Sequence, residues 1–289
     1  MARAGWVLGL VVCLGAGLVR ADPKSPLIDG DYLVGEMGVL RLSAVAMNGS
    51  KERFKVDGKY VSGTRCAFAP TEVLIEGIID GTVLIATLRT CMEGSGCPTP
   101  NDVAILGVIS EGVVTAYIDI PRGCSAPGLE AQRLVMEASA SSLREAGNNF
   151  VKTQNYARAA AVYRRLTELP GGATDVDLLF RLGAAYNGLK RYQEGRAAFR
   201  KAMSLQGYGA LTSEDKAYLL YNLACAEAGL IATDPEAESA AVGHLKEALE
   251  LAKKPRLPLK ENAAVDEDLQ PLAGNPEFQK LLGIRKGVR

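Results

Sequence analysis

Cysteine is the residue type whose spacing in this sequence could support the most distinctive chemistry. Four cysteines lie close together in the first half of the chain, and these are Cys66, Cys91, Cys97 and Cys124. No histidine lies near them, and the interval from Cys91 to Cys97 is wider than zinc ligands usually show, so we predict two disulfides and no metal site. Of the three possible pairings we favour Cys91 with Cys97, which would close a Gly-rich hairpin tip. The second bond would join Cys66 to Cys124.

The remaining reactive side chains form no recognisable catalytic pattern. His244 is the only histidine and has no Ser, Cys or Asp partner in a known motif, so we expect a structural role for it. Residues 94–96 lack the lysine and the following helix of a phosphate loop. Cys225 lies in an apolar run and is expected to be a buried thiol. Residues 266–268 are acidic but lack the spacing of a calcium loop, and we predict neither an enzyme nor a cofactor.

The first 21 residues have the pattern of a secretory signal peptide. Arg3 gives a positive start, an apolar run extends from Val7 to Val19, and small residues precede an expected cleavage after Ala21. The run is shorter than the roughly 20 residues that span a membrane, and no later segment reaches that length. We therefore predict an exported bacterial protein, periplasmic or extracellular, with no membrane span after cleavage.

Length and composition predict two folded domains after this signal. The chain has 289 residues, of which 48% are hydrophobic and 23% charged, as in ordinary globular proteins. The formal net charge is zero and no basic stripe is apparent, which argues against nucleic-acid binding. A turn cluster and a change of composition place the boundary after Cys124. We expect a β domain at 22–124, a linker at 125–132 and a helical domain at 133–289.

The β domain is predicted to be an antiparallel meander of six to eight strands that closes into a small barrel or sandwich. Strands expected at 73–79 and 82–88 flank Asp80-Gly81, a dipeptide that two-residue hairpin turns prefer. By the same reasoning, strands at 104–109 and 113–118 flank Glu111-Gly112. Asp57-Gly58 predicts a third turn, between strands at 54–56 and 59–61.

The helical half contains a repeated pattern of small and aromatic residues. Gly147, Phe150, Ala159 and Tyr163 recur 36 residues later as Gly183, Tyr186, Gly195 and Phe199. This pattern resembles the tetratricopeptide repeat, in which small residues let paired helices approach and aromatic residues fill the space between them. The resemblance implies repeats at about 141–174 and 177–208. A looser copy at 217–252, in which Glu227 replaces an aromatic residue, precedes a capping tail at 262–283.

The resemblance also implies a binding surface, because the first helix of each repeat in this family lines a groove for a peptide or a partner's helix. The residues expected on that groove are Arg144, Asn148, Lys152, Arg181, Asn187, Tyr218, Tyr221 and Asn222. A carboxylate grip by Arg144 and Asn148 is a possible variant, and solvent-exposed helix charges are the plain alternative.

Two classes of function follow from this organisation. The first is a non-enzymatic scaffold or interaction protein that holds a protein or peptide in the repeat groove. The second places the activity in the β domain, as a carbohydrate or small-ligand binder or an enzyme with accessory repeats. A concave pocket lined by Tyr32, Tyr60 or Phe68 would favour the second class, and a solidly filled β domain would favour the first.

Overall fold

The structure is a computed structural model that describes residues 25–34, 37–48, 50, 52–63, 68–95, 97, 101–125 and 133–283. The predicted signal peptide, Cys66 and the linker residues from 126 to 132 lie outside the described residues. The chain divides into two compact units, with the boundary between Thr153 and Gln154. Among the described residues, none of the helices is long and apolar enough to cross a membrane.

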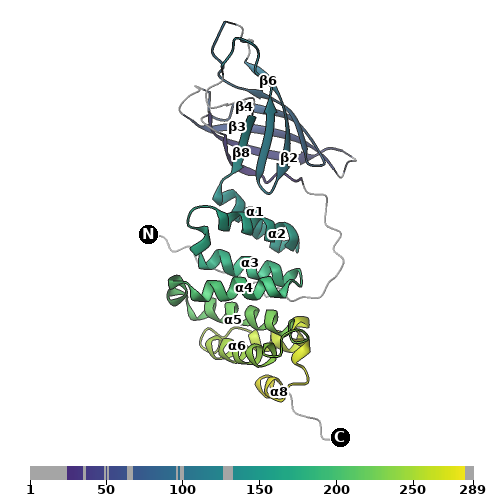
Figure 1. Cartoon of the computed structure of the whole chain (residues 1–289), viewed down its shortest axis with the longest axis vertical. Helices are drawn as coiled ribbons and strands as arrows, with labels where there is room; N and C mark the ends of the chain where they lie inside the picture. The colour runs from purple at the N-terminus through teal and green to yellow at the C-terminus, as the bar shows by residue number, and fades with distance from the viewer. Residues whose placement is uncertain are drawn as a thin grey trace. The chain divides into compact units, whose positions relative to one another are not determined.

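The first unit is a closed antiparallel barrel in which each strand pairs with the next one in the sequence and β8 pairs with β1 (Figure 1). The described strands are β1 (Gly30–Val34), β2 (Gly38–Ala46), β3 (Arg53–Ser62), β4 (Val73–Asp80), β5 (Val83–Arg89), β6 (Asp102–Ser110), β7 (Val113–Ile118) and β8 (Arg133–Ala138). The meander was predicted from the sequence, and of the two predicted closures the structure shows the barrel.

Side chains alternate between the inside and the outside of the barrel along each strand. On β6, for example, Val103, Ile105 and Ile109 are buried, whereas Leu106 and Val108 are exposed. The same alternation fills the interior with apolar side chains from the other strands, such as Leu40, Phe54 and Leu88.

Two of the three predicted hairpins are present, although the turn between β4 and β5 is formed by Gly81 and Thr82, because Asp80 is the last residue of β4. Gly81 has a φ of 58° between β4 and β5, and Glu111 and Gly112 have φ values of 48° and 81° between β6 and β7. Two-residue turns that suit twisted strands have positive φ at the first central residue, as at Gly81, or at both, as at Glu111 and Gly112. The third turn was wrong, because Asp57 and Gly58 lie within the continuous strand β3. A β-carbon at Gly58 would lie 2.6 Å from Leu42 Cδ2 and 2.9 Å from Ile75 Cβ, so glycine here makes room for barrel packing.

The disulfide pairing differs from the one we favoured. Cys97 is bonded to Cys124, with their Cα atoms 5.2 Å apart, so both favoured pairings were wrong. Cys91 is also disulfide-bonded. The Cys97–Cys124 bond joins the loop after β5 to the loop after β7, where Glu93 and Ser125 exchange two backbone hydrogen bonds of 2.9 Å. The bond therefore ties together two loops that are distant in sequence, and does not close one hairpin tip.

The boundary of the helical domain also needs correction. Residues Arg133–Ala138, which we placed in the helical half, form β8 and close the barrel. The next helix, α1 (Ala140–Lys152), groups with the barrel in the same compact unit. Ser142 Oγ accepts a 2.9 Å hydrogen bond from the Asp31 amide of β1, and the Ser139 amide donates to the Asp31 carbonyl at 2.8 Å. Helix α1 is thus held to the first strand of the barrel.

The second unit is all-helical and begins at Gln154. Its described α-helices are α2 (Tyr156–Glu168), α3 (Val176–Gly188), α4 (Tyr192–Ser204), α5 (Ser213–Ala228), α6 (Ala237–Ala252), α7 (Leu259–Val265) and α8 (Pro276–Leu282). Three short 3-10 helices are also described in this unit, namely η2 (Gly172–Thr174), η3 (Gln206–Ala210) and η4 (Glu267–Leu272). Consecutive helices from α2 to α6 pack against each other in chain order, as Figure 1 shows for α3 to α6.

Helix α5 is the central element of this unit. Eleven of its residues are buried, including the unbroken run from Leu219 to Ala228, because it packs against α3, α4, α6 and η4. The run includes the predicted buried thiol Cys225, which is free and fully buried. Helix α8 begins after Asn275, whose Oδ1 accepts hydrogen bonds from the amides of Glu277 and Phe278.

Buried carboxylates connect α5 to its neighbours. Glu227, the residue that replaces an aromatic in the loose repeat, is fully buried. Its carboxylate accepts a 2.9 Å hydrogen bond from Arg200 of α4 and lies 2.6 Å from Nδ1 of His244 on α6. Asp266 accepts a 2.6 Å hydrogen bond from the Tyr221 hydroxyl. A buried carboxylate needs such partners, and these bonds fix α4, α6 and η4 against α5.

Candidate partner-binding site

The eight residues predicted to line one groove do not form one accessible set. Arg144, Asn148 and Lys152 lie on α1, which belongs to the barrel unit. The other five lie on α3 and α5 of the helical unit.

Three of those five residues are buried and hold the helices together. Asn187, Tyr221 and Asn222 are each 1% exposed. Asn187 Nδ2 donates to the Asn222 carbonyl at 2.8 Å, and Asn222 Nδ2 donates to the Tyr218 carbonyl at 2.9 Å. The prediction that these three residues contact a partner was therefore wrong, because they are buried and their side-chain donors form hydrogen bonds inside the unit.

Arg181 and Tyr218 are the two residues of the predicted set in the helical unit that remain partly accessible. Arg181 Nε donates to Asp177 one helical turn earlier, at 2.9 Å. Burial alone would lower the pKa of Arg181, but the hydrogen bonds and charges of Asp177 and Tyr163 together outweigh it, so the pKa is raised. Burial raises the pKa of Tyr218, and the charge of Glu214 adds to that shift. Arg181 is committed to Asp177, which weakens the case for it as a partner contact.

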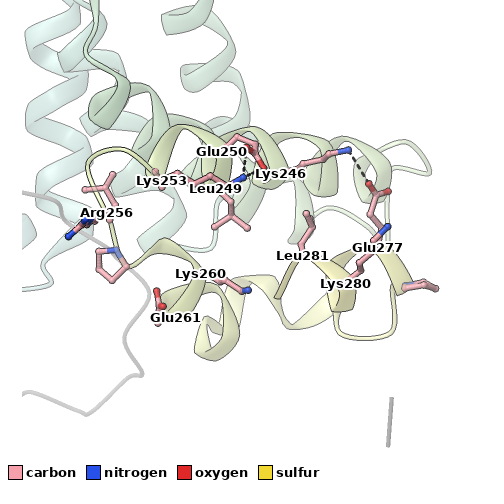
Figure 2. Close-up of a pocket in the computed structure, with 14 residues that line it drawn as sticks. Lys246, Leu249, Glu250, Lys253, Arg256, Lys260, Glu261, Glu277, Lys280 and Leu281 are labelled. Carbon is pink, nitrogen blue, oxygen red and sulfur yellow. Dashed lines mark hydrogen bonds and ion pairs between the residues drawn. The ribbon is translucent and has the colours of Figure 1, made fainter. Parts of the chain in front are cut away.

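The helical unit has an accessible pocket away from the predicted groove, between α6, α7 and α8 (Figure 2). Its volume is about 920 Å³, within the range of protein ligand sites. Leu249 of α6 and Leu281 of α8 contribute to its apolar part (Figure 2). The other apolar residues that line it are Ala252, Leu257, Pro258 and Pro276. We call this hollow the α6–α8 pocket.

The charged side chains of the α6–α8 pocket are predominantly basic. Five basic residues line it, namely Lys246, Lys253, Arg256, Lys260 and Lys280, against three acidic ones, namely Glu250, Glu261 and Glu277. Lys253 pairs with Glu250 at 2.6 Å and Lys246 with Glu277 at 3.7 Å, as the dashed lines in Figure 2 mark. Within the part of the chain that the structure describes, the other three basic side chains have no carboxylate partner.

Sequence reasoning missed this pocket, although a signal was present. Residues 253–260 read Lys-Lys-Pro-Arg-Leu-Pro-Leu-Lys, which combines basic and apolar residues at a helix-to-helix turn. The whole-chain charge of zero hides this local excess. The pocket also needs α8 to fold back beside α6, a contact between distant parts of the sequence.

The described residues offer little for catalysis at this pocket. Its lining contains no Ser, Cys, His or Thr side chain. His244 is engaged with the fully buried Glu227. Over the described ranges, no group of three or more His, Cys, Asp or Glu side chains is placed to hold a metal ion.

Comparison of the chain with models of known protein families and with curated proteins gives no match. Function is therefore argued from the geometry of the barrel and of the α6–α8 pocket.

Proposed function

We propose that this is an exported, non-enzymatic protein that holds a protein or peptide partner through its helical half. The observation that carries the proposal is the α6–α8 pocket, a hollow of about 920 Å³ with apolar walls and surplus positive charge. Such a mixture of apolar surface and a few charged groups is typical of recognition sites. The site differs from the groove that the sequence predicts, but it lies in the same half of the chain.

The proposal includes a tetratricopeptide-like arrangement of α2 to α6, supported by a contact that recurs along the unit. A β-carbon at Gly188, the last residue of α3, would overlap the ring of Tyr156 at the start of α2. A β-carbon at Gly229, after α5, would overlap the ring of Tyr192 at the start of α4. Equivalent contacts between a small residue and an aromatic ring, one helix pair apart, are what a helical repeat requires.

Export is supported by the Cys97–Cys124 disulfide, because such bonds persist mainly in oxidising compartments. The leader-like sequence of the first 21 residues points the same way.

The barrel is the less favoured location of the activity. Tyr32 and Tyr60 are buried, and the ring of Tyr60 meets that of Phe68 edge to face, with 5.6 Å between centroids. None of these three aromatic residues lines the α6–α8 pocket. A barrel of eight strands has an interior that its own side chains can fill, and the inward residues here are large and apolar.

The proposal is tested by affinity capture with the exported chain, full length after the signal. The chain is immobilised and exposed to an envelope extract of its native cell, and the retained proteins are identified by mass spectrometry. We expect a specific protein to be retained by wild type, and to be lost when the helical surface is altered. If the partner is lost only when the barrel is substituted, and not when the helical surface is altered, the proposal is overturned.

A further inference from the structure

Within the described ranges, three basic side chains without a carboxylate partner surround the α6–α8 pocket. Arg256 lies in the turn between α6 and α7, Lys260 on α7 and Lys280 on α8, so the unpaired positive charges come from three separate places around the hollow. All three residues are exposed. An isolated surplus of positive charge attracts anionic groups, and its distribution suits a ligand with more than one carboxylate.

The apolar part of the pocket excludes a ligand that is only charged. Leu249, Leu257 and Leu281 are half-buried and face the same hollow as the basic residues. Burying an apolar side chain against them would favour binding, because it removes apolar surface from water. A ligand that used the whole site would therefore carry both carboxylates and apolar side chains.

A peptide segment fits these requirements better than a nucleic acid or the chain's own end. A phosphate backbone would leave Leu249, Leu257 and Leu281 without an apolar group to contact. The segment that follows the described residues, 284–289, reads Ile-Arg-Lys-Gly-Val-Arg and carries like charge. The leucines and the basic residues of the pocket are together complementary to an acidic, amphipathic segment of another protein.

We propose that the α6–α8 pocket binds an acidic peptide segment, with its Asp or Glu carboxylates on Arg256, Lys260 and Lys280 and an apolar side chain against the leucines. This inference rests on the proposed function and names the class of partner for it.

The test measures peptide binding to the exported full-length chain by fluorescence anisotropy. The probe is a labelled ten-residue peptide of alternating Glu and Leu. One comparison peptide replaces Glu by Gln, and the other replaces Leu by Ser. We expect the Glu-Leu peptide to bind most tightly and to weaken as salt is raised, because exposed ion pairs are screened.

Variants then locate the site. The double substitution Arg256→Glu with Lys260→Glu should weaken binding of the Glu-Leu peptide by about tenfold or more, since two favourable charge contacts become repulsive. The matched control Lys201→Glu reverses an exposed lysine on α4, outside the pocket, and should leave binding unchanged. Circular dichroism checks that both variants are folded. If the double variant loses helix, Lys280→Glu replaces it as the test variant.

Three results would overturn this inference: equal binding of the Gln-Leu peptide, unchanged binding by the variants, or displacement of the peptide by polyphosphate at lower concentration than by excess Glu-Leu peptide. Failure of the proposed function is seen separately. If the native partner is captured through the barrel alone, the proposed function fails whatever the peptides do. If partner capture requires the helical half but the Glu-Leu peptide does not bind, only the acidic-segment inference fails.

Discussion

The ring of Tyr156 packs directly over Gly188, so closely that residue 188 has no room for a β-carbon. The contact joins the first turn of α2 to the last residue of α3. It sets how near two successive helices come to each other, which is the geometric property that a stack of paired helices depends on.

Substitution Gly188→Ala is therefore expected to destabilise the helical unit, by about 1–3 kcal/mol, as overpacking usually does. The matched control is Gly243→Ala on α6, where a β-carbon would meet no atom within 4 Å. That change should stabilise by about 0.5–1 kcal/mol, because alanine loses less backbone entropy than glycine in a helix. Urea unfolding measures both, and equal effects at the two positions would refute the close contact.

The closure of the barrel by β8 predicts which C-terminal truncations of the first unit still fold. A fragment of residues 22–153 contains β8 and α1 and should fold, because β8 pairs with both β7 and β1. A fragment that ends at Gly128 lacks β8 and leaves the edges of β1 and β7 unpaired, so it should aggregate or stay unfolded. Far-ultraviolet circular dichroism and gel filtration distinguish the two. A folded, monomeric 22–128 fragment would contradict the assigned closure.

The disulfide arrangement predicts both a peptide map and a thiol count. Proteolysis of the unreduced protein should release one disulfide-linked pair that contains Cys97 and Cys124, and Cys91 should be found in a second disulfide. Among the described cysteines, Cys225 is free, and it is fully buried. It should react with a thiol reagent only after unfolding. Recovery of a Cys91–Cys97 peptide would show that our first pairing was right and the structure wrong.

The pair Arg196–Asp234 predicts a contribution to stability that depends on pH. The hydrogen bond from Arg196, which joins α4 to the turn before α6, holds the pKa of Asp234 below its ordinary value of 3.8. A depressed folded-state pKa stabilises the fold above the ordinary pKa, and this stabilisation is lost as pH falls through the lower, folded value. Asp234→Asn should therefore reduce stability at pH 7 and make its decline in acid shallower. Urea midpoints for both proteins at pH 7 and in acid test this, and parallel pH curves would count against it.

The barrel was predictable to the extent that its signals are local. The turns at Gly81 and Gly112 follow from their dipeptides, since few residues accept positive φ. The same dipeptide logic failed at Gly58, where glycine is required by Leu42 and Ile75 of the neighbouring strands. Strand β8 was missed because its closure with β1 joins residues about 100 positions apart, as at Leu33 and Glu137.

The predicted groove failed for a related reason. Asn187 and Asn222 are polar, and a helical pattern read from one sequence places polar residues on the outside. In the structure α5 is covered on several sides, and the Asn187 amide donates to the Asn222 backbone carbonyl inside the unit. The sequence pattern could not show this, because the cover comes from tertiary packing of α3, α4, α6 and η4 around α5.

The central claim is that the helical half holds the partner. Its most direct test is the dissociation constant of the captured partner protein, measured for wild type and for two variants of the exported chain. The pocket variant is Arg256→Glu with Lys260→Glu, and the barrel variant is Val45→Lys, at an exposed residue of β2. We predict at least about tenfold weaker binding for the pocket variant, corresponding to roughly 1.4 kcal/mol, and unchanged binding for the barrel variant. Unchanged binding by the pocket variant with a large loss in the barrel variant would contradict the account.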